Sequence, residues 1–327
     1  MRRRSLLAGG FAGLGTAYAL ERALAQRWRA GASEVAAAGL SMPDDVEHHF
    51  IATSDGGRIH AVEAGAGPPI VLMHGITLGV GIWVRQFREL SKSHRVIAVS
   101  LRGHGQSIGV AGGYTFVRLA DDVLEVLTEL DVSGAVVVGH SMGGMVLQVA
   151  ALARAEQLRK HAVGIVLLAT DAGPAIPGPV GRPVGSTLAV MAVRAAGYAE
   201  RHSKGVSPGS DLATWGTRLC FGARPDPADV ELVRSISAAV SPRAMAELVV
   251  PLFAFDVRID LHEIDLPTLV ISGSRDLLTP ARRGREMAER ILGARLEVLP
   301  GCGHIVMLER SAELNRMLED FSTELTG

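Results

Sequence analysis

The sequence has few cysteines, little net charge and no pattern of metal ligands. Two cysteines in 327 residues exclude a small disulfide-stapled scaffold, because such chains are short and rich in cysteine. A formal net charge of −1 gives no general attraction to nucleic acid, so no such partner is predicted. No cluster of His, Cys and Asp has metal-ligand spacing, and the Gly-rich run at 65–67 precedes a strand pattern, unlike a dinucleotide fingerprint. We therefore expect neither a metal nor a cofactor.

Disorder is excluded by composition, since hydrophobic residues make up 48% of the chain and charged residues 20%. Long apolar runs are lacking outside the N-terminus. There, Arg2, Arg3 and Arg4 precede an uncharged run of 15 residues, Leu6 to Leu20, which is shorter than the roughly 20 residues of a bilayer-spanning helix. With Ala23-Leu24-Ala25 behind it, this pattern is typical of a secretory signal peptide cleaved before residue 26. The paired arginines also resemble a twin-arginine export signal.

Two alternatives remain open for the N-terminal segment. It could be an uncleaved anchor whose Arg22, Arg27 and Arg29 contact anionic headgroups, or a frayed helix on a cytoplasmic protein. Residues 1–29 carry a net charge of +5 and the remaining chain −6, so the segment differs in kind from the body. We expect residues 1–45 to be a signal or anchor with its linker, and the protein to be exported or membrane-associated.

Short apolar runs alternate with helical patterns from residue 46 onward. Val46–Thr53 and Arg58–Glu63 flank Asp55-Gly56-Gly57 and predict an antiparallel hairpin. Further apolar runs, typical of strands buried on both faces, lie at 69–73, 95–100, 135–139, 163–169, 267–272 and 295–299. Helical patterns lie near 82–91, 116–130, 142–159, 281–291 and 306–323. The alternation predicts an α/β fold, with a mostly parallel central sheet and helices on both faces.

One interval, residues 171–260, breaks this alternation. It has no convincing strand and gives helical patterns near 186–203, 211–221, 227–240 and 242–254. Nearly 90 residues are too many for an ordinary crossover, and insertions of that length often form active-site lids. We predict a helical cap over 171–260, inserted into a core made of residues 46–170 and 261–327.

Three polar residues follow predicted strands in the order Ser, Asp, His. Ser141 lies in Gly139-His140-Ser141-Met142-Gly143, a G-x-S-x-G pattern between a strand and a helix, where a strained turn exposes the hydroxyl. Asp276 and His304 each end a short Gly-containing turn after a strand, and open α/β sheets place their sites at these strand ends. Asp171, after the sixth strand, is the alternative acid.

The serine hydroxyl needs a base and a stabilised oxyanion to react. His304 is the expected base and Asp276 its orienting acid. Met73-His74-Gly75-Ile76 follows the third strand, and the backbone amides of Ile76 and Met142 are the expected oxyanion-hole donors.

These residues resemble the α/β-hydrolase superfamily over roughly residues 46–327. The matching positions are His74-Gly75, the pattern around Ser141, Asp276 and His304, in the order typical of the family. Many members carry Asp-x-Arg-Gly-His-Gly-x-Ser after the fourth strand. Here Ser100 replaces the first Asp, a departure that affects a local turn and leaves the triad intact.

The resemblance implies a serine hydrolase of the esterase or lipase kind, with a helical cap. We expect it to cleave an ester or lactone of a fairly apolar small molecule through an acyl-enzyme on Ser141. Serine at this position argues against epoxide hydrolase and haloalkane dehalogenase chemistry, in which the nucleophile is a carboxylate. A carbon–carbon bond hydrolase, a cofactor-free perhydrolase and a non-catalytic ligand-binding member remain as alternatives. The sequence does not indicate an oligomeric state.

Overall fold

The computed structural model describes residues 40–174 and 216–327. Its strands are β1 (Glu47–Ala52), β2 (Arg58–Ala64), β3 (Pro69–Met73), β4 (Arg95–Val99), β5 (Ala135–His140), β6 (Ala162–Leu168), β7 (Thr268–Gly273) and β8 (Arg295–Leu299). Its helices are η1 (Val80–Trp83), α3 (Val84–Leu90), α4 (Phe116–Glu129), α5 (Met142–Ala153), α6 (Ala155–His161), α9 (Pro227–Ala238), α10 (Pro242–Ala254), η2 (Leu261–Glu263), α11 (Ala281–Arg290), α12 (Val306–Glu309) and α13 (Ser311–Thr326). The predicted signal segment lies outside the described residues.

All eight strands join one sheet in the order β1-β2-β4-β3-β5-β6-β7-β8. β1 and β2 form the predicted antiparallel hairpin, and β2 also runs antiparallel to β4. Every pair from β4 through β8 is parallel. The prediction of an α/β fold with a mostly parallel sheet is therefore confirmed, and each predicted strand lies within about two residues of its observed bounds.

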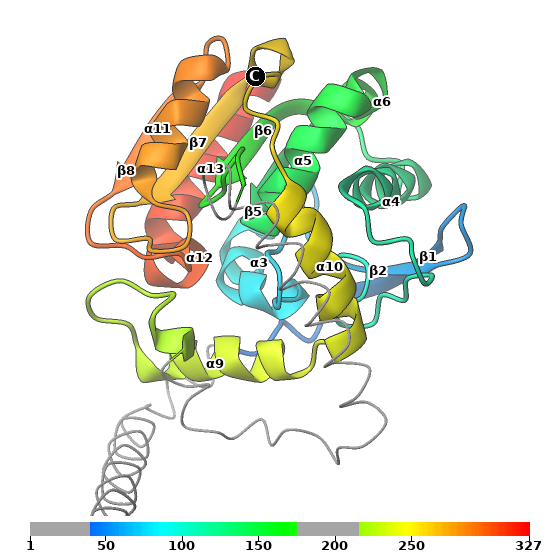
Figure 1. Cartoon of the computed structure of the whole chain (residues 1–327), viewed down its shortest axis with the longest axis horizontal. Helices are drawn as coiled ribbons and strands as arrows, with labels where there is room; N and C mark the ends of the chain where they lie inside the picture. Colours follow the sequence, from blue (N-terminus) through cyan, green and yellow to red (C-terminus); the bar gives the residue numbers. More distant parts are fainter. Residues whose placement is uncertain (1–39, 175–215) are drawn as a thin grey trace, which may run out of the picture.

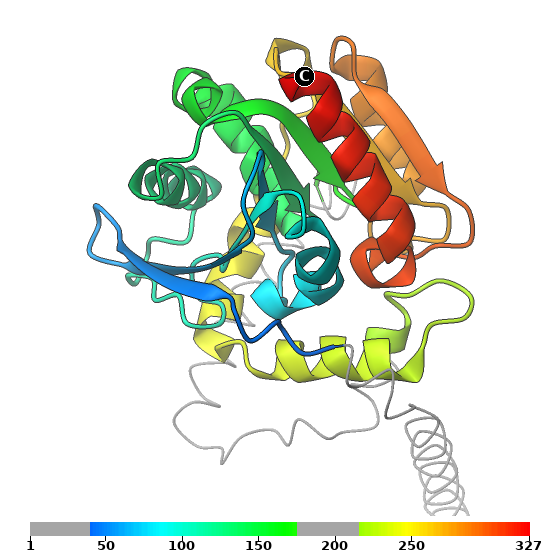
Figure 2. The same cartoon turned by 180° about the vertical axis from the view of Figure 1, so that it is seen from behind.

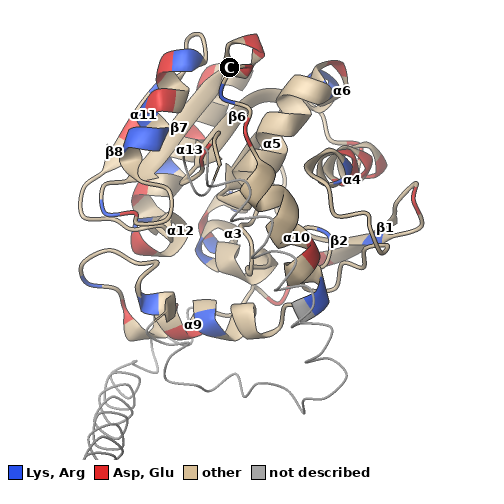
Figure 3. Ribbon diagram, viewed as in Figure 1, with Lys and Arg blue, Asp and Glu red and all other residues tan. Residues whose placement is uncertain are grey.

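Alternate residues of the central strands point to opposite faces of the sheet, and each face has its own core. Val71 and Met73 pack with α4, α5, α6 and α11, whereas Ile70 and Leu72 pack with α3, α12 and α13. Figures 1 and 2 show these two helix layers from opposite sides. Figure 3 shows the charged residues on the outer helices and loops, with the central strands free of them. Burial on both faces explains why these strands are continuous apolar runs.

Two predicted helices are each broken in two. Residues 142–159 form α5 and α6, which meet at Arg154 (φ −137°, ψ 30°), and residues 306–323 form α12 and α13, which meet at Arg310 (φ −135°, ψ 41°). Both arginines turn outward to make tertiary contacts: Arg154 pairs with Asp121 at 2.7 Å, and Arg310 donates to the carbonyl of Pro300 at 2.7 Å. The predictions of continuous helices were therefore wrong at these two positions. Neither break carries a Gly or Pro that would have indicated it in the sequence.

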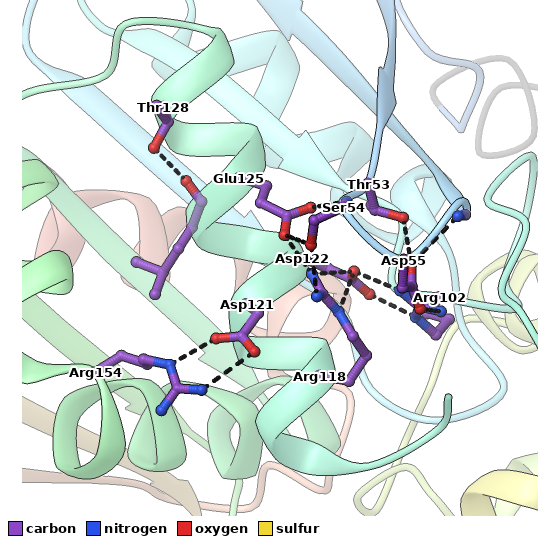
Figure 4. A network of polar contacts seen from close by, with 12 residues as sticks. Thr53, Ser54, Asp55, Arg102, Arg118, Asp121, Asp122, Glu125, Thr128 and Arg154 are labelled. Carbon is purple, nitrogen blue, oxygen red and sulfur yellow. Dashed lines mark hydrogen bonds and ion pairs between the residues drawn. The ribbon is translucent and has the colours of Figure 1, made fainter. Parts of the chain in front are cut away.

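A buried arginine network joins the hairpin to the first long helix (Figure 4). The Arg102 side chain is fully buried and donates to both oxygens of Asp122, at 2.6 and 2.7 Å, and to Asp55 at 2.8 and 3.0 Å. Arg118 extends the network from Asp122 to Glu125. Burial raises the pKa of Asp122 even beside these arginines. The β1–β2 turn, the loop after β4 and α4 are thus held by one set of charges.

Two helices of the predicted cap, α9 and α10, lie in the described part. Asp226 and Ser241 cap their N-termini with side-chain hydrogen bonds, and a proline follows each cap. Figures 1 and 2 show α9 crossing the end of the sheet toward which the strands β7 and β8 run. The helical pattern at 186–203 falls outside the described residues.

Among the described residues, no single helix is long and apolar enough to cross a bilayer, although α9 and α10, bent by 102°, have the length and composition to do so as a pair.

Candidate active site

Ser141 lies at a sharp turn between β5 and α5. Its backbone adopts φ 52° and ψ −117°, a sparsely populated conformation that costs on the order of 1–3 kcal/mol. The turn brings β5 and α5 so close together that position 139 requires glycine: a Cβ at Gly139 would lie 2.6 Å from the carbonyl oxygen of Gly143. The Ser141 side chain does not cap α5. Its hydroxyl is therefore presented, half-buried, at the carboxyl end of the sheet.

Asp276 and His304 come together from the loops after β7 and β8. Oδ2 of Asp276 accepts a hydrogen bond from Nδ1 of His304 at 2.8 Å. Thr279 donates to the same carboxylate through its backbone amide (2.9 Å) and its hydroxyl (2.7 Å), and the amide of Leu278 donates at 2.8 Å. Burial alone would raise the pKa of Asp276, but the bonds from His304 and Thr279 outweigh it and lower the pKa. The carboxylate is therefore ionised, and its hydrogen bond with His304 keeps a ring proton on Nδ1.

Ser141 and His304 both line a cavity of about 240 Å³. Core residues such as Ile76 form one part of the wall, and Val233 and Cys220 of the predicted cap form another. The Ser141 hydroxyl makes no hydrogen bond within residues 40–174 and 216–327. Over the same ranges, no group of three or more His, Cys, Asp or Glu residues is arranged to hold a metal ion.

The loop after β3 packs directly against the serine. The amide of Leu101 donates to Nε2 of His74 at 3.0 Å, so Nδ1 carries the ring proton and donates to the carbonyl of Gly75 at 2.8 Å. A Cβ at Gly75 would lie 2.9 Å from the Cβ of Ser141, so this close approach requires glycine. Ile76 lines the cavity, and Met142 is the first residue of α5, where backbone N–H groups have no partner within the helix.

His140 makes a contact that the sequence analysis missed. Its Nε2 donates to the backbone carbonyl of His304 at 3.0 Å, and the two rings lie 4.7 Å apart. Burial lowers the pKa of His140 to about 3, so the ring is neutral and Nε2 carries the proton. The residue before the serine thus holds the loop that carries His304. No local sequence pattern indicates this bond, because its partners are 164 residues apart.

Asp171, the alternative acid, has other partners. Its Oδ1 accepts from the amide of Gly173 at 3.0 Å, and its Oδ2 lies 3.3 Å from Nε of Arg283. The structure therefore pairs His304 with Asp276 and pairs Asp171 with an arginine.

A family model described as the alpha/beta hydrolase fold matches residues 68–311. The chain belongs to this family. The α/β-hydrolase is 31% identical over 290 residues to the non-heme chloroperoxidase CPO-A1 of Kitasatospora aureofaciens, covering 82% of this chain and 97% of that one.

Two solved structures are also similar to this α/β-hydrolase. An esterase from Thermogutta terrifontis has a TM-score of 0.72 and 25% identity, covering 86% of this chain and 100% of its own. An enol-lactonase from Burkholderia xenovorans has a TM-score of 0.70 and 28% identity, covering 84% and 100%. The family and these relatives support hydrolase chemistry on this fold.

Ser100, the departure from the family pattern, keeps a turn contact. Its hydroxyl donates to the carbonyl of His104 at 3.2 Å, and its own carbonyl accepts from the hydroxyl of Ser107 at 2.6 Å. A Cβ at Gly105 would lie 2.7 Å from the Ser100 hydroxyl oxygen. The small side chain thus fits a tight turn that is already hydrogen-bonded.

Proposed function

We propose that this α/β-hydrolase cleaves an ester or lactone bond of a fairly apolar small molecule through an acyl-enzyme on Ser141. The observation that carries the proposal is the bond between Asp276 and His304 at 2.8 Å. The ring of His304 lines the same cavity as Ser141. An imidazole nitrogen that shares a cavity with a serine hydroxyl can serve as the base that acyl transfer needs.

In the first half of the reaction, Nε2 of His304 takes the hydroxyl proton while Ser141 Oγ bonds to the substrate carbonyl carbon. The negative charge then formed on the carbonyl oxygen lies near the amides of Ile76 and Met142, and losing one such donor typically costs about 10²–10³ in turnover. The carbon–oxygen bond to the leaving alkoxide breaks as His304 returns the proton to it. Asp276 stabilises the imidazolium throughout this step.

In the second half, a water molecule replaces the leaving group. His304 removes its proton as its oxygen attacks the acyl carbon, and the proton passes to Ser141 Oγ when the acyl–serine bond breaks. A carboxylic acid is released and the free serine returns. An ester or lactone suits this cycle better than an amide, because an alkoxide leaves more readily than an amine.

The cavity wall supports an apolar substrate. Ile76, Val233, Leu278 and Ile305 line it together with Ser141, and apolar walls with a few polar groups are typical of small-molecule sites. The similarity to an enol-lactonase, at 28% identity, adds support for lactones within this class.

A second candidate reaction is cofactor-free perhydrolysis. The similarity to a non-heme chloroperoxidase, at 31% identity, favours it. Hydrogen peroxide would attack the acyl-enzyme in place of water, and the product would be a peracid. The same three residues would serve both reactions.

A fluorophosphonate probe tests the proposal. We expect it to label Ser141, and we expect Ser141→Ala to abolish both labelling and p-nitrophenyl ester turnover. Ser235→Ala, at an exposed serine of α9, is the matched control and should keep both. Unchanged turnover in Ser141→Ala would refute the mechanism, and binding of esters without labelling or turnover would favour a ligand-binding protein.

A substrate panel then separates the candidate reactions. Short- and long-chain esters, lactones and vinylogous 1,5-diketones would be assayed with water alone and with added hydrogen peroxide. Peracid formation that outruns hydrolysis would favour the perhydrolase. Cleavage of the diketones alone would favour a carbon–carbon bond hydrolase.

A further inference from the structure

A single carboxylate joins the predicted cap to the loop that carries His304. Glu309, the last residue of α12, accepts a hydrogen bond at Oε2 from the amide of Gly222, at 2.7 Å. Its Oε1 accepts from the amide of Gly303, at 3.0 Å. Gly222 belongs to the predicted cap and Gly303 directly precedes His304. Both oxygens of one side chain thus bind two segments about 80 residues apart.

The two segments also touch each other through their backbones. The amide of His304 donates to the carbonyl of Cys220 at 2.7 Å. A Cβ at Gly303 would lie 2.4 Å from the nitrogen of Gly222, and a Cβ at Gly222 would lie 2.1 Å from the oxygen of Gly301. Neither glycine therefore has room for a side chain. The position of His304 consequently depends on how closely cap residues 220–222 approach loop residues 301–304.

The charge of Glu309 suits this contact. The side chain is partly buried, and burial raises its pKa against the opposing hydrogen bonds from the amides of Gly222 and Gly303 and the positive charge of Arg218. Arg218 itself donates to the carbonyls of Gly222 and Ala223. A carboxylate can accept at both oxygens, whereas the amide of a glutamine presents one acceptor and one donor. Hydrogen bonds to a charged acceptor are also about twice as strong as neutral ones.

We propose that Glu309 is a positioning residue that seats cap residues 220–222 on loop residues 301–304 and so places His304 opposite Ser141. This inference rests on the proposed function of Ser141 and His304. It assigns to the cap a part in aligning the base, in addition to covering the cavity.

Two variants test the contact from opposite sides. Glu309→Gln keeps the side-chain size and turns one acceptor into a donor that faces a backbone N–H. Gly222→Ala keeps Glu309 and forces the two backbones apart. Glu297→Gln, at an exposed carboxylate of β8, is the matched control. Each full-length protein would be reacted with the fluorophosphonate probe, and the rate constant and the final extent of labelling would be measured separately.

We expect Glu309→Gln and Gly222→Ala to lower the rate constant by about 10- to 100-fold, as for the loss of one charge-assisted hydrogen bond. The extent of labelling should stay near one probe per chain. A purely structural role would lower the extent and leave the rate constant of the folded fraction unchanged. Ester turnover should show the same loss in kcat, with little change in KM.

The proton on Nδ1 of His304 gives a readout that does not depend on activity. Its low-field NMR resonance reports the bond to Asp276, and we expect it to shift or broaden in both variants and to stay unchanged in Glu297→Gln. Wild-type rate constants and an unmoved resonance in both variants would overturn the inference. If wild-type protein were not labelled at all, the proposed function would fail, and the resonance alone would decide the role of Glu309.

Discussion

Asp276→Asn is the sharpest test of the site, because four donors surround this carboxylate. Two of them, the amides of Leu278 and Thr279, are backbone groups that bind Oδ1 and cannot reverse. The other two, His304 Nδ1 and the Thr279 hydroxyl, bind Oδ2 and can turn acceptor. The asparagine will therefore keep its oxygen at the Oδ1 position and point its NH₂ group at His304.

This orientation fixes the wrong tautomer of the base. An NH₂ group facing Nδ1 makes that nitrogen the acceptor and moves the ring proton to Nε2, which then cannot take the proton of Ser141. We expect kcat to fall by about 10³–10⁴. The free energy of unfolding should change by only about 1 kcal/mol, because every buried donor keeps an acceptor or can rotate to find one.

The assay is p-nitrophenyl ester turnover beside urea denaturation, with Asp171→Asn as the matched control. Asp171 is buried and bound to Arg283 and Gly173, so its replacement should cost stability and less than about tenfold in kcat. A larger loss of kcat in Asp171→Asn than in Asp276→Asn would reassign the acid. A large loss of stability in Asp276→Asn would refute the argument from the fixed backbone donors.

Three further predictions concern stability and location. Burial raises the pKa of Asp229 to about 6 against its ion pair with Arg85. A carboxyl whose pKa is raised in the folded state stabilises the fold less as pH rises through that pKa. Between about pH 4 and about pH 7, the free energy of unfolding measured in urea should therefore fall by on the order of 1–3 kcal/mol more in wild-type protein than in Asp229→Asn. Arg102→Ala leaves the buried Asp122 without its main partner and should cost about 3–5 kcal/mol of unfolding free energy; a loss below about 1 kcal/mol would contradict the network. We also propose that the N-terminal segment exports or anchors the protein, so mass spectrometry should find a chain that begins at Gln26 or fractionation should find it with membranes. An intact N-terminus in a soluble cytoplasmic fraction would contradict this.

The strands were predictable because each is a short apolar run with a turn signal beside it. Val136, Val137 and Val138 are all buried, and a short run of β-branched residues next to a turn residue favours a strand over a helix. The sheet order was not predictable, since β2 pairs with β4 although β3 lies between them in the sequence. The helix breaks at Arg154 and Arg310 also lacked a local signal, because tertiary contacts of the arginine side chains accompany them.

The chemical groups of the site could be predicted, but the contacts that hold them in place could not. Ser141, Asp276 and His304 stand at strand ends, where topology alone brings residues together. Thr279 had a local signal, since Asp followed three residues later by Thr can form a hydrogen-bonded turn. His140 and Glu309 had none, because their partners are distant in sequence and are recognised only once the sheet and cap are assembled.

The hydrogen bond from His140 to the carbonyl of His304 joins the middle of the chain to its last 25 residues. The segment with His304 follows β8, which lies at the edge of the sheet and has only β7 as a neighbour. During synthesis, the serine turn can therefore fold long before His304, its proposed base, has left the ribosome. A nascent or C-terminally truncated chain would carry a strained serine without the histidine, so hydrolytic activity would mark the completion of folding.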